Sequence, residues 1–205
     1  MKIVIAGAGE VGTHLAKMLS QENQDIILMD PNEERLKFTN NMEVLAMVGN
    51  PTSLKDLQES GIKDADLFIS VTPEEPTNIT ACMLAHSLGA HKTLARINNY
   101  EYLQPKNIEF FQKLGISSMI YPEMLAAREI VTAVQRPWAR QYWELFGGAL
   151  ILIGVKVRDN APIVNKKLTD LSLDQKLYHI VAIKRANETI IPRGIDSLHL
   201  NSSEL

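Results

Sequence analysis

The chain has 205 residues, of which 45% are hydrophobic and 22% are charged, and its formal net charge is −3. This composition can bury one large core, or one ordinary core beside a small one, whereas an acidic chain is a poor candidate for binding a nucleic-acid backbone. The one cysteine, Cys82, excludes an intrachain disulfide and a cysteine-based metal site. We also find no apolar run of about 18 residues that would span a membrane.

Strands and helices are expected to alternate over the first two-thirds of the chain. The expected strands are 2–6, 25–29, 44–48, 67–71, 93–97 and 119–121. The expected helices are 13–20, 31–40, 52–60, 78–88, 100–114 and 123–134. The strands are apolar on both faces, which is typical of a parallel sheet covered by helices. Short connections between these units predict an α/β fold, a doubly wound Rossmann-like parallel sheet.

The pattern changes after Arg136 and Pro137. The expected strands are now 149–157, 180–184 and 189–191, with a short helix between the first two, which indicates a small α+β lobe. We therefore predict a nucleotide-binding domain at 1–136, a connection at 137–148 and the C-terminal lobe at 149–205.

A glycine loop follows the first expected strand and leads into the first expected helix. Its residues are Gly7, Ala8, Gly9, Glu10, Val11 and Gly12. In such a loop the first glycine permits a tight turn, the second lets the backbone approach a diphosphate, and the third allows close helix–strand packing. The helix N-terminus then attracts the phosphates. The alternative is a glycine turn without a ligand.

An acidic residue closes the second expected strand. It is Asp30, followed by Pro31. A carboxylate at this place can accept both ribose hydroxyls and would repel a 2′-phosphate. The sequence therefore predicts binding of NAD(H) or an adenosine nucleotide rather than NADP(H).

An NAD-dependent oxidoreductase is the alternative function. Such an enzyme needs a proton-transfer group near the nicotinamide. The small lobe offers only His179, in a hydrophobic region, and His199, near the end of the chain, and no HExxH or Ser-His-Asp pattern occurs. We therefore predict no catalytic residues and no metal site.

Several segments together suggest a family. They are KIVIAGAGEVGTHLA at 2–16, Asp30, 48–52, 69–72, Asn78, 94–97, 115–116, 120–123, 162–163, 182–185 and 191–194. In order and spacing they resemble the RCK (KTN) domains that regulate potassium channels and transporters, and most of all the N-terminal half of the TrkA subunits. The resemblance extends over essentially the whole chain.

The resemblance implies a cytosolic regulatory subunit that binds NAD(H), or ATP/ADP at the same site. It implies a homo-oligomer on the inner face of the cell membrane that gates an integral membrane potassium transporter subunit (TrkH-like), with no catalysis, no nucleic acid partner and no direct membrane insertion. Beyond the glycine loop and Asp30, the family's site maps onto Gly49, Asn50, Thr52, Val71, Thr72, Arg96 and Glu123.

The chain departs from the family pattern in three places. Residues 75–77 (Glu-Pro-Thr) stand where the family usually has Asp-Glu before the Asn of the fourth βα turn. Asn50 and Pro51 stand where the family usually has Asp and Ala, which removes one carboxylate near the nucleoside. The C-terminal lobe lacks its usual last strand, so we expect the native protein to continue past Leu205 with a second unit of the same kind.

Overall fold

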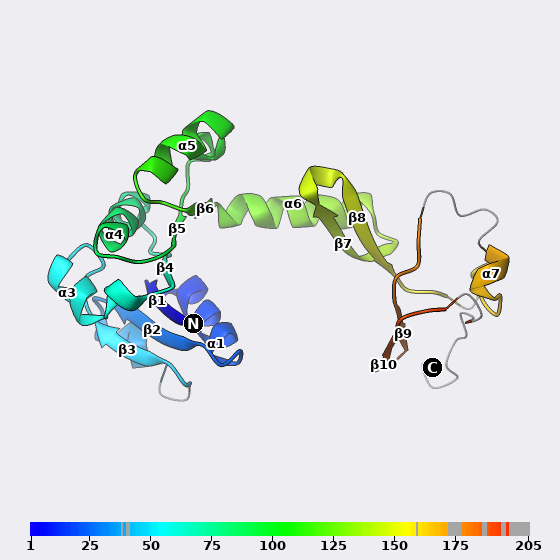
Figure 1. The fold of residues 1–205 in the computed structure, drawn as a ribbon, viewed down its shortest axis with the longest axis horizontal. Coiled ribbons are helices and arrows are strands. Elements are labelled where there is room, and N and C mark those ends of the chain that lie inside the picture. The colour runs from blue at the N-terminus through cyan, green and yellow to red at the C-terminus, as the bar shows by residue number, and fades with distance from the viewer. Residues whose placement is uncertain are drawn as a thin grey trace. The chain divides into compact units, whose positions relative to one another are not determined.

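The computed structural model describes residues 1–37, 39, 42–158, 160–171, 178–185, 188–193 and 196. The chain divides into two compact units, Met1–Arg128 and Glu129–Leu205 (Figure 1). Among the described residues, no helix combines the length and the apolar character needed to cross a bilayer.

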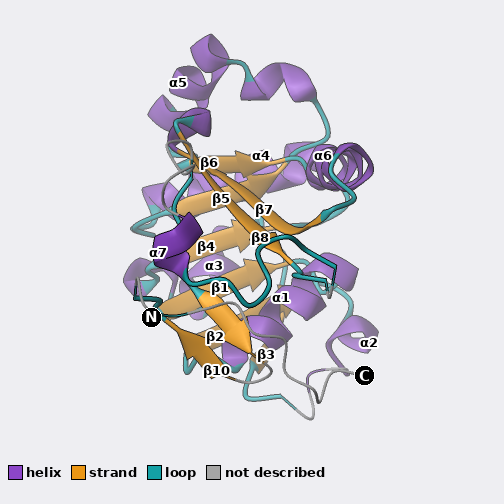
Figure 2. Ribbon diagram, turned by 90° about the vertical axis from the view of Figure 1, so that its right-hand side faces the viewer, coloured by secondary structure: helices purple, strands orange, loops and turns teal. Residues whose placement is uncertain are grey.

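The first unit is built on one parallel sheet of six strands (Figure 2). The strands are β1 (Lys2–Ala6), β2 (Asp25–Asp30), β3 (Leu45–Val48), β4 (Leu67–Ser70), β5 (Thr93–Arg96) and β6 (Ser118–Ile120). Their order is β3-β2-β1-β4-β5-β6, so the chain reverses its winding direction between β1 and β4. This order confirms the doubly wound Rossmann-like prediction, and open sheets of this kind bind ligands at the crevice where the winding reverses.

Helices connect consecutive strands of this sheet, and one further helix follows its last strand. They are α1 (Glu10–Ser20), α2 (Glu33–Leu36), α3 (Leu54–Glu59), α4 (Glu75–Ser87), α5 (Pro105–Lys113) and α6 (Pro122–Gln135), with 3-10 turns η2 (Ile62–Asp64) and η3 (Tyr100–Leu103). Helices α1 and α4 begin three residues before the expected positions 13 and 78. In α4 the cause is Pro76, which is tolerated in the first helical turn because the N–H it lacks would have no partner there.

The inner strands bury both faces, as expected for a parallel sheet, whereas the edge strand β3 is largely exposed. In β1, Val4 and Ala6 join the core that includes residues of α3, α4 and α5. Ile3 and Ile5 point the other way, into the core formed with α1 and α2. Figure 1 shows α1 and α4 on opposite sides of the sheet. The carboxyl ends of the strands are thereby held firmly between two packed layers.

The second unit contains two small antiparallel pairs. Strand β7 (Ala139–Leu145) pairs with β8 (Leu150–Val155) across the turn η4 (Phe146–Gly148), and β9 (Ile183–Arg185) pairs with β10 (Glu188–Ile190). A short helix, α7 (Leu168–Leu171), lies between β8 and β9 in the chain. Residues 137–148, expected as a connection, thus contain a strand. Of the residues after Arg193, where the family has its last strand, only Asp196 is among those described.

Cys82 lies on α4 with no exposed surface, and its burial raises the pKa of the thiol to about 12. The ordinary pKa of a thiol is 9.0. Above about pH 9 the thiol of Cys82 loses its proton in the unfolded chain but keeps it in the folded chain. We therefore expect the free energy of unfolding to fall as pH rises from about 9 to 12. At pH 8 an aromatic disulfide reagent should label Cys82 only after urea is added. Rapid labelling of the native chain would contradict this expectation.

Candidate nucleotide-binding site

The candidate residues from the sequence all lie beyond or at the carboxyl ends of strands in the first unit, or in the first turns of the helices that follow. Gly7 to Gly12 follow β1, Asp30 and Pro31 close β2, Gly49 to Thr52 follow β3, Val71 and Thr72 follow β4, Arg96 ends β5, and Glu123 lies in the first turn of α6, after β6. Because parallel strands end at the same edge of a sheet, these segments share one edge of the first unit.

Three glycines of the loop differ in what surrounds them. Gly7 has φ +103°, and a Cβ added there would lie 3.0 Å from the Thr72 nitrogen. A Cβ on Gly12 would lie 1.8 Å from the carbonyl oxygen of Gly7. Gly9, the N-cap of α1, has nothing within 4 Å of an added Cβ, and no side chain caps the helix there. The loop is therefore packed tightly at both ends and open in the middle, at the N-terminus of α1.

Asp30 ties the glycine loop to β2. It is 2% exposed, and its carboxylate accepts hydrogen bonds from the backbone N–H groups of Ala8 and Asn32, both at 2.8 Å. Arg35 lies 3.8 Å from one carboxylate oxygen. Each oxygen of an ionised carboxylate can accept two hydrogen bonds, so one acceptor site per oxygen is left for a further donor.

The segment after β3 is a compact polar turn. The Gly49 N–H donates to the Asp30 carbonyl at 3.2 Å. Asn50 accepts from the N–H and the hydroxyl of Thr52, and its own N–H donates to the carboxylate of Asp56 at 2.7 Å. This N–H, with the hydroxyl of Ser53, holds the pKa of Asp56 below its usual value. The Asn50 side-chain oxygen is therefore already committed to the turn.

A buried amide joins the ends of β4 and β5. Asn78, on α4, is 1% exposed. Its side-chain oxygen accepts from Ser70 and from both the N–H and the hydroxyl of Thr72, and its nitrogen donates to the carbonyls of Thr72 and Arg96. From the sequence, Asn78 was identified only as one of the residues of the family resemblance and as the first residue of an expected helix. The signal that could have found it is a carboxamide one turn into a helix that follows a buried strand.

Arg96 and Glu123 form an ion pair across the ends of β5 and β6. The guanidinium donates to the Glu123 carboxylate at 2.8 Å, and the two side chains are 21% and 55% exposed. The Nε atom of Arg96 is buried without a hydrogen-bond partner among the described residues. A buried N–H of this kind is costly to leave unpaired, and it can be satisfied by an anion.

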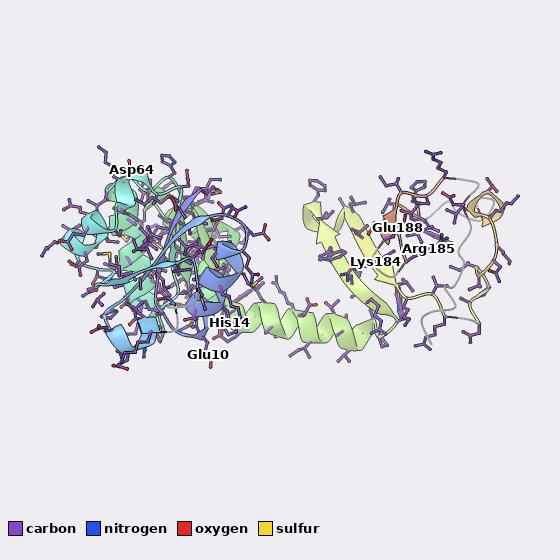
Figure 3. All side chains as sticks on the ribbon, turned by 90° about the horizontal axis from the view of Figure 1, so that it is seen from below. Glu10, His14, Asp64, Lys184, Arg185 and Glu188 are labelled. Atoms are coloured by element: carbon purple, nitrogen blue, oxygen red, sulfur yellow. The ribbon has the colours of Figure 1, made fainter. Side chains whose placement is uncertain are left out.

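The contacts above run without a break along the edge of the sheet, in the order of its strands. The segment after β3 bonds to Asp30 of β2, and Asp30 bonds to the glycine loop after β1. The glycine loop packs on Thr72 after β4. Asn78 joins Thr72 to Arg96 of β5, and Arg96 pairs with Glu123 after β6. Pro31, Glu10 and Val11 take no part in this line and are exposed. Figure 3 labels Glu10 and His14, one turn apart on α1, and both are exposed.

The curated relatives include a Trk system potassium uptake protein TrkA homolog of Methanothermobacter thermautotrophicus, 34% identical over 94% of this chain and 87% of that protein. The TrkA homolog of Archaeoglobus fulgidus is 33% identical over 95% of this chain. The chain spans 44% of that relative, 43% of the TrkA of Halomonas elongata and 46% of TrkA homolog 2 of Methanosarcina mazei.

Solved structures share the fold. The RCK domain of GsuK superposes over 97% of this chain and 42% of its own, with a TM-score of 0.60 and 16% identity. The GsuK channel bound to NAD covers 97% of this chain and 35% of its own, with a TM-score of 0.62 and 16% identity. At such identities the likeness concerns the fold alone.

The family match itself is longer than half of the chain. The TrkA-N domain family matches residues 3–122, which include the parallel sheet apart from Lys2 and every candidate site residue except Glu123. With the relative from Methanothermobacter thermautotrophicus, this match establishes that the chain belongs to the TrkA-N domain family.

Proposed function

We propose that the chain is a nucleotide-binding regulatory subunit of a potassium transport system. The observation that carries the proposal is the glycine loop, which is packed at Gly7 and Gly12 and open at Gly9, where the uncapped N–H groups of α1 begin. Free N–H groups and the positive end of the helix dipole favour a diphosphate at this point. We infer the transport system from the relatives, which are Trk system potassium uptake protein TrkA homologs.

The proposed ligand is NAD(H), or ATP/ADP at the same site. Its diphosphate would lie on the glycine loop, and its ribose hydroxyls would donate to the free acceptor positions of Asp30. The segment at Gly49 to Thr52 would line the nucleoside, and Val71 and Thr72, which pack against Gly7 and Gly12, would lie beside the phosphates. Arg96 would meet the outer phosphates. One of the related structures is the GsuK channel bound to NAD, and another is GsuK bound to ADP.

The proposed action is allosteric and involves no chemistry. A ligand shifts a conformational equilibrium only if it binds the two states with different affinities. Here the ligand would compete with Glu123 for Arg96, and Glu123 belongs to α6. A change at that ion pair would be passed to an integral membrane potassium transporter subunit, of TrkH-like type, at the cytoplasmic face of the membrane.

Calorimetric titration of the purified chain with NAD, NADH, ATP, ADP and NADP tests the binding step. We expect saturable binding of at least one of the first four, and weaker binding of NADP because Asp30 would face its 2′-phosphate. If none of the five binds, the regulatory proposal loses its ligand. If NADP binds as tightly as NAD, the role of Asp30 is wrong.

We further propose that the subunit works as a homo-oligomer, with α6 as part of the interface between copies. No residue of α6 is buried. Ile130, Val131 and Val134 lie on one side of this helix at a spacing of one and four residues, and are 64%, 51% and 75% exposed. A contiguous apolar stripe left in water is typical of a surface that a partner covers. The resemblance to the RCK domains implies a homo-oligomer, so a second copy is the expected partner.

Light scattering after gel filtration measures this association. We expect the wild-type chain to elute as a dimer or larger, and Val134→Glu to shift the mass toward the monomer, because a buried carboxylate has no partner in an apolar interface. Ala133→Glu is the matched control, since it adds the same charge to an exposed position off the stripe. A monomeric wild-type chain, or equal effects of both variants, would contradict α6 as the interface.

A further inference from the structure

The ladder of hydrogen bonds between β4 and β5 ends before the crevice does. Its last residue pair is Ser70 with Ala95. Thr72 and Arg96 lie beyond that pair, and the Thr72 N–H and the Arg96 carbonyl both bond to the side chain of Asn78. One amide therefore replaces a missing rung of the sheet at the place where a ligand would lie.

The amide of Asn78 is fully used. Its oxygen accepts from the Ser70 hydroxyl at 2.9 Å, from the Thr72 N–H at 2.8 Å and from the Thr72 hydroxyl at 2.7 Å. Its nitrogen donates to the Thr72 carbonyl at 3.0 Å and to the Arg96 carbonyl at 2.9 Å. A carboxamide has two donor hydrogens, and both are committed here. Such a saturated buried group holds its partners in one arrangement, because each lost bond leaves a polar atom unpaired.

Two of the three partners of Asn78, Thr72 and Arg96, belong to the proposed phosphate region. Thr72 packs against Gly7, because a Cβ added to Gly7 would lie 3.0 Å from the Thr72 nitrogen. Arg96 carries the guanidinium with the unpaired buried Nε. The distance between the glycine loop and the guanidinium is thus set through a single side chain that does not itself line the crevice.

We propose that Asn78 is a positioning residue that fixes the spacing between the glycine loop and Arg96 for the phosphates of the bound nucleotide. This inference rests on the proposed function. The Asp30 end of the crevice does not depend on Asn78, because Asp30 is held by Ala8 and Asn32. Loss of the Asn78 amide is therefore expected to weaken binding of the phosphates selectively, and to leave recognition of the nucleoside nearly unchanged.

The test is the ratio of two affinities, for ADP and for adenosine, in Asn78→Asp. This variant keeps the acceptor oxygen for Ser70 and Thr72 and loses the two N–H bonds to the carbonyls of Thr72 and Arg96. Because its new carboxylate could repel phosphates by charge alone, Asn78→Leu, which removes the amide without adding a charge, is measured in parallel and is expected to show the same selective fall. We expect the affinity for ADP to fall about tenfold or more, and that for adenosine to change by less than about threefold.

Thr93→Val is the matched control for a purely structural effect. Thr93 is also 1% exposed and also makes two side-chain hydrogen bonds, to the Gly115 carbonyl and the Ser117 N–H, but it lies at the opposite end of β5. We expect this variant to unfold at a lower temperature with an unchanged affinity ratio. If Asn78→Asp does not fold, Thr72→Val removes one of the Asn78 bonds and should lower the same ratio to a smaller extent.

The outcomes separate the two proposals. A wild-type chain that binds none of NAD, NADH, ATP and ADP overturns the nucleotide-binding function, and the role of Asn78 with it. If the chain binds NAD but not ADP, NAD takes the place of ADP in the ratio. A wild-type chain that binds ADP, with an unchanged ratio in Asn78→Asp or an equal change in Thr93→Val, overturns the role of Asn78 alone.

Discussion

Gly9→Asp is expected to abolish nucleotide binding while the chain stays folded. An added Cβ at Gly9 meets nothing within 4 Å, and the backbone there, at φ −77°, is accessible to any residue. Gly9 is the N-cap of α1 and no side chain fills that role, so an aspartate can accept from the first free N–H groups of the helix. The new carboxylate would thus occupy the donors that a phosphate needs, and the thermal midpoint should be unchanged or slightly raised.

The expected loss of affinity is large because the new carboxylate both repels the phosphates and occupies the N–H groups that would bind them. Two unit charges about 4 Å apart near a protein surface repel by roughly 4 kcal/mol. A fall of about 100-fold or more in calorimetric affinity for ADP or NAD corresponds to roughly 2.8 kcal/mol. Gly9→Asn is the matched control, since it has the same shape and cap without the charge, and we expect it to weaken binding by only about tenfold. Full affinity in Gly9→Asp would place the phosphates elsewhere and would remove the basis of the proposed site.

The residues of this site differ in how far the sequence alone could identify them. The glycine loop and Asp30 carry local signals, because each directly follows a short apolar run and the required spacing lies within a few residues. Strand β1 was expected at 2–6 and forms at Lys2–Ala6 for the same reason. Asn78 has only a weak local signal, a carboxamide one turn into a helix, and this signal does not identify its partners. Its partners Ser70 and Arg96 are 8 and 18 residues away, and they reach it only through the order of the strands.

Strand β7 was missed for a different physical reason. Residues 139–145 mix aromatic and charged side chains, and the turn to β8 follows immediately at Phe146, Gly147 and Gly148. All three turn residues have positive φ, at 51°, 66° and 91°. Two glycines after a mixed segment resemble a connection, whereas a hairpin depends on pairing with a strand that comes later in the chain. The aromatic residues Tyr142 and Trp143 were the available signal for a strand.

Gly12→Ala is expected to destabilise the first unit, against the usual effect of this change. In the interior of a helix, alanine is better than glycine by about 1 kcal/mol. At Gly12 the new Cβ would lie 1.8 Å from the carbonyl oxygen of Gly7 and 3.0 Å from its carbonyl carbon. Both neighbours are backbone atoms of a loop that is held by the bond from the Gly7 N–H to the Met29 carbonyl, so they cannot move aside cheaply. We expect the free energy of unfolding to fall by about 1–3 kcal/mol.

Urea unfolding followed by far-UV circular dichroism measures this loss. Tryptophan fluorescence is unsuitable because both tryptophans, Trp138 and Trp143, belong to the second unit. Hydrogen exchange should place the loss of protection in β1 and α1, since the overlap forces these two elements apart. Gly9→Ala is the control, because it adds the same methyl group three residues earlier into open space and should leave stability within about 0.5 kcal/mol. Equal stability of the two variants would mean that α1 does not approach β1 as closely as the glycine loop requires. The helix N-terminus would then lack the geometry needed to bind a diphosphate.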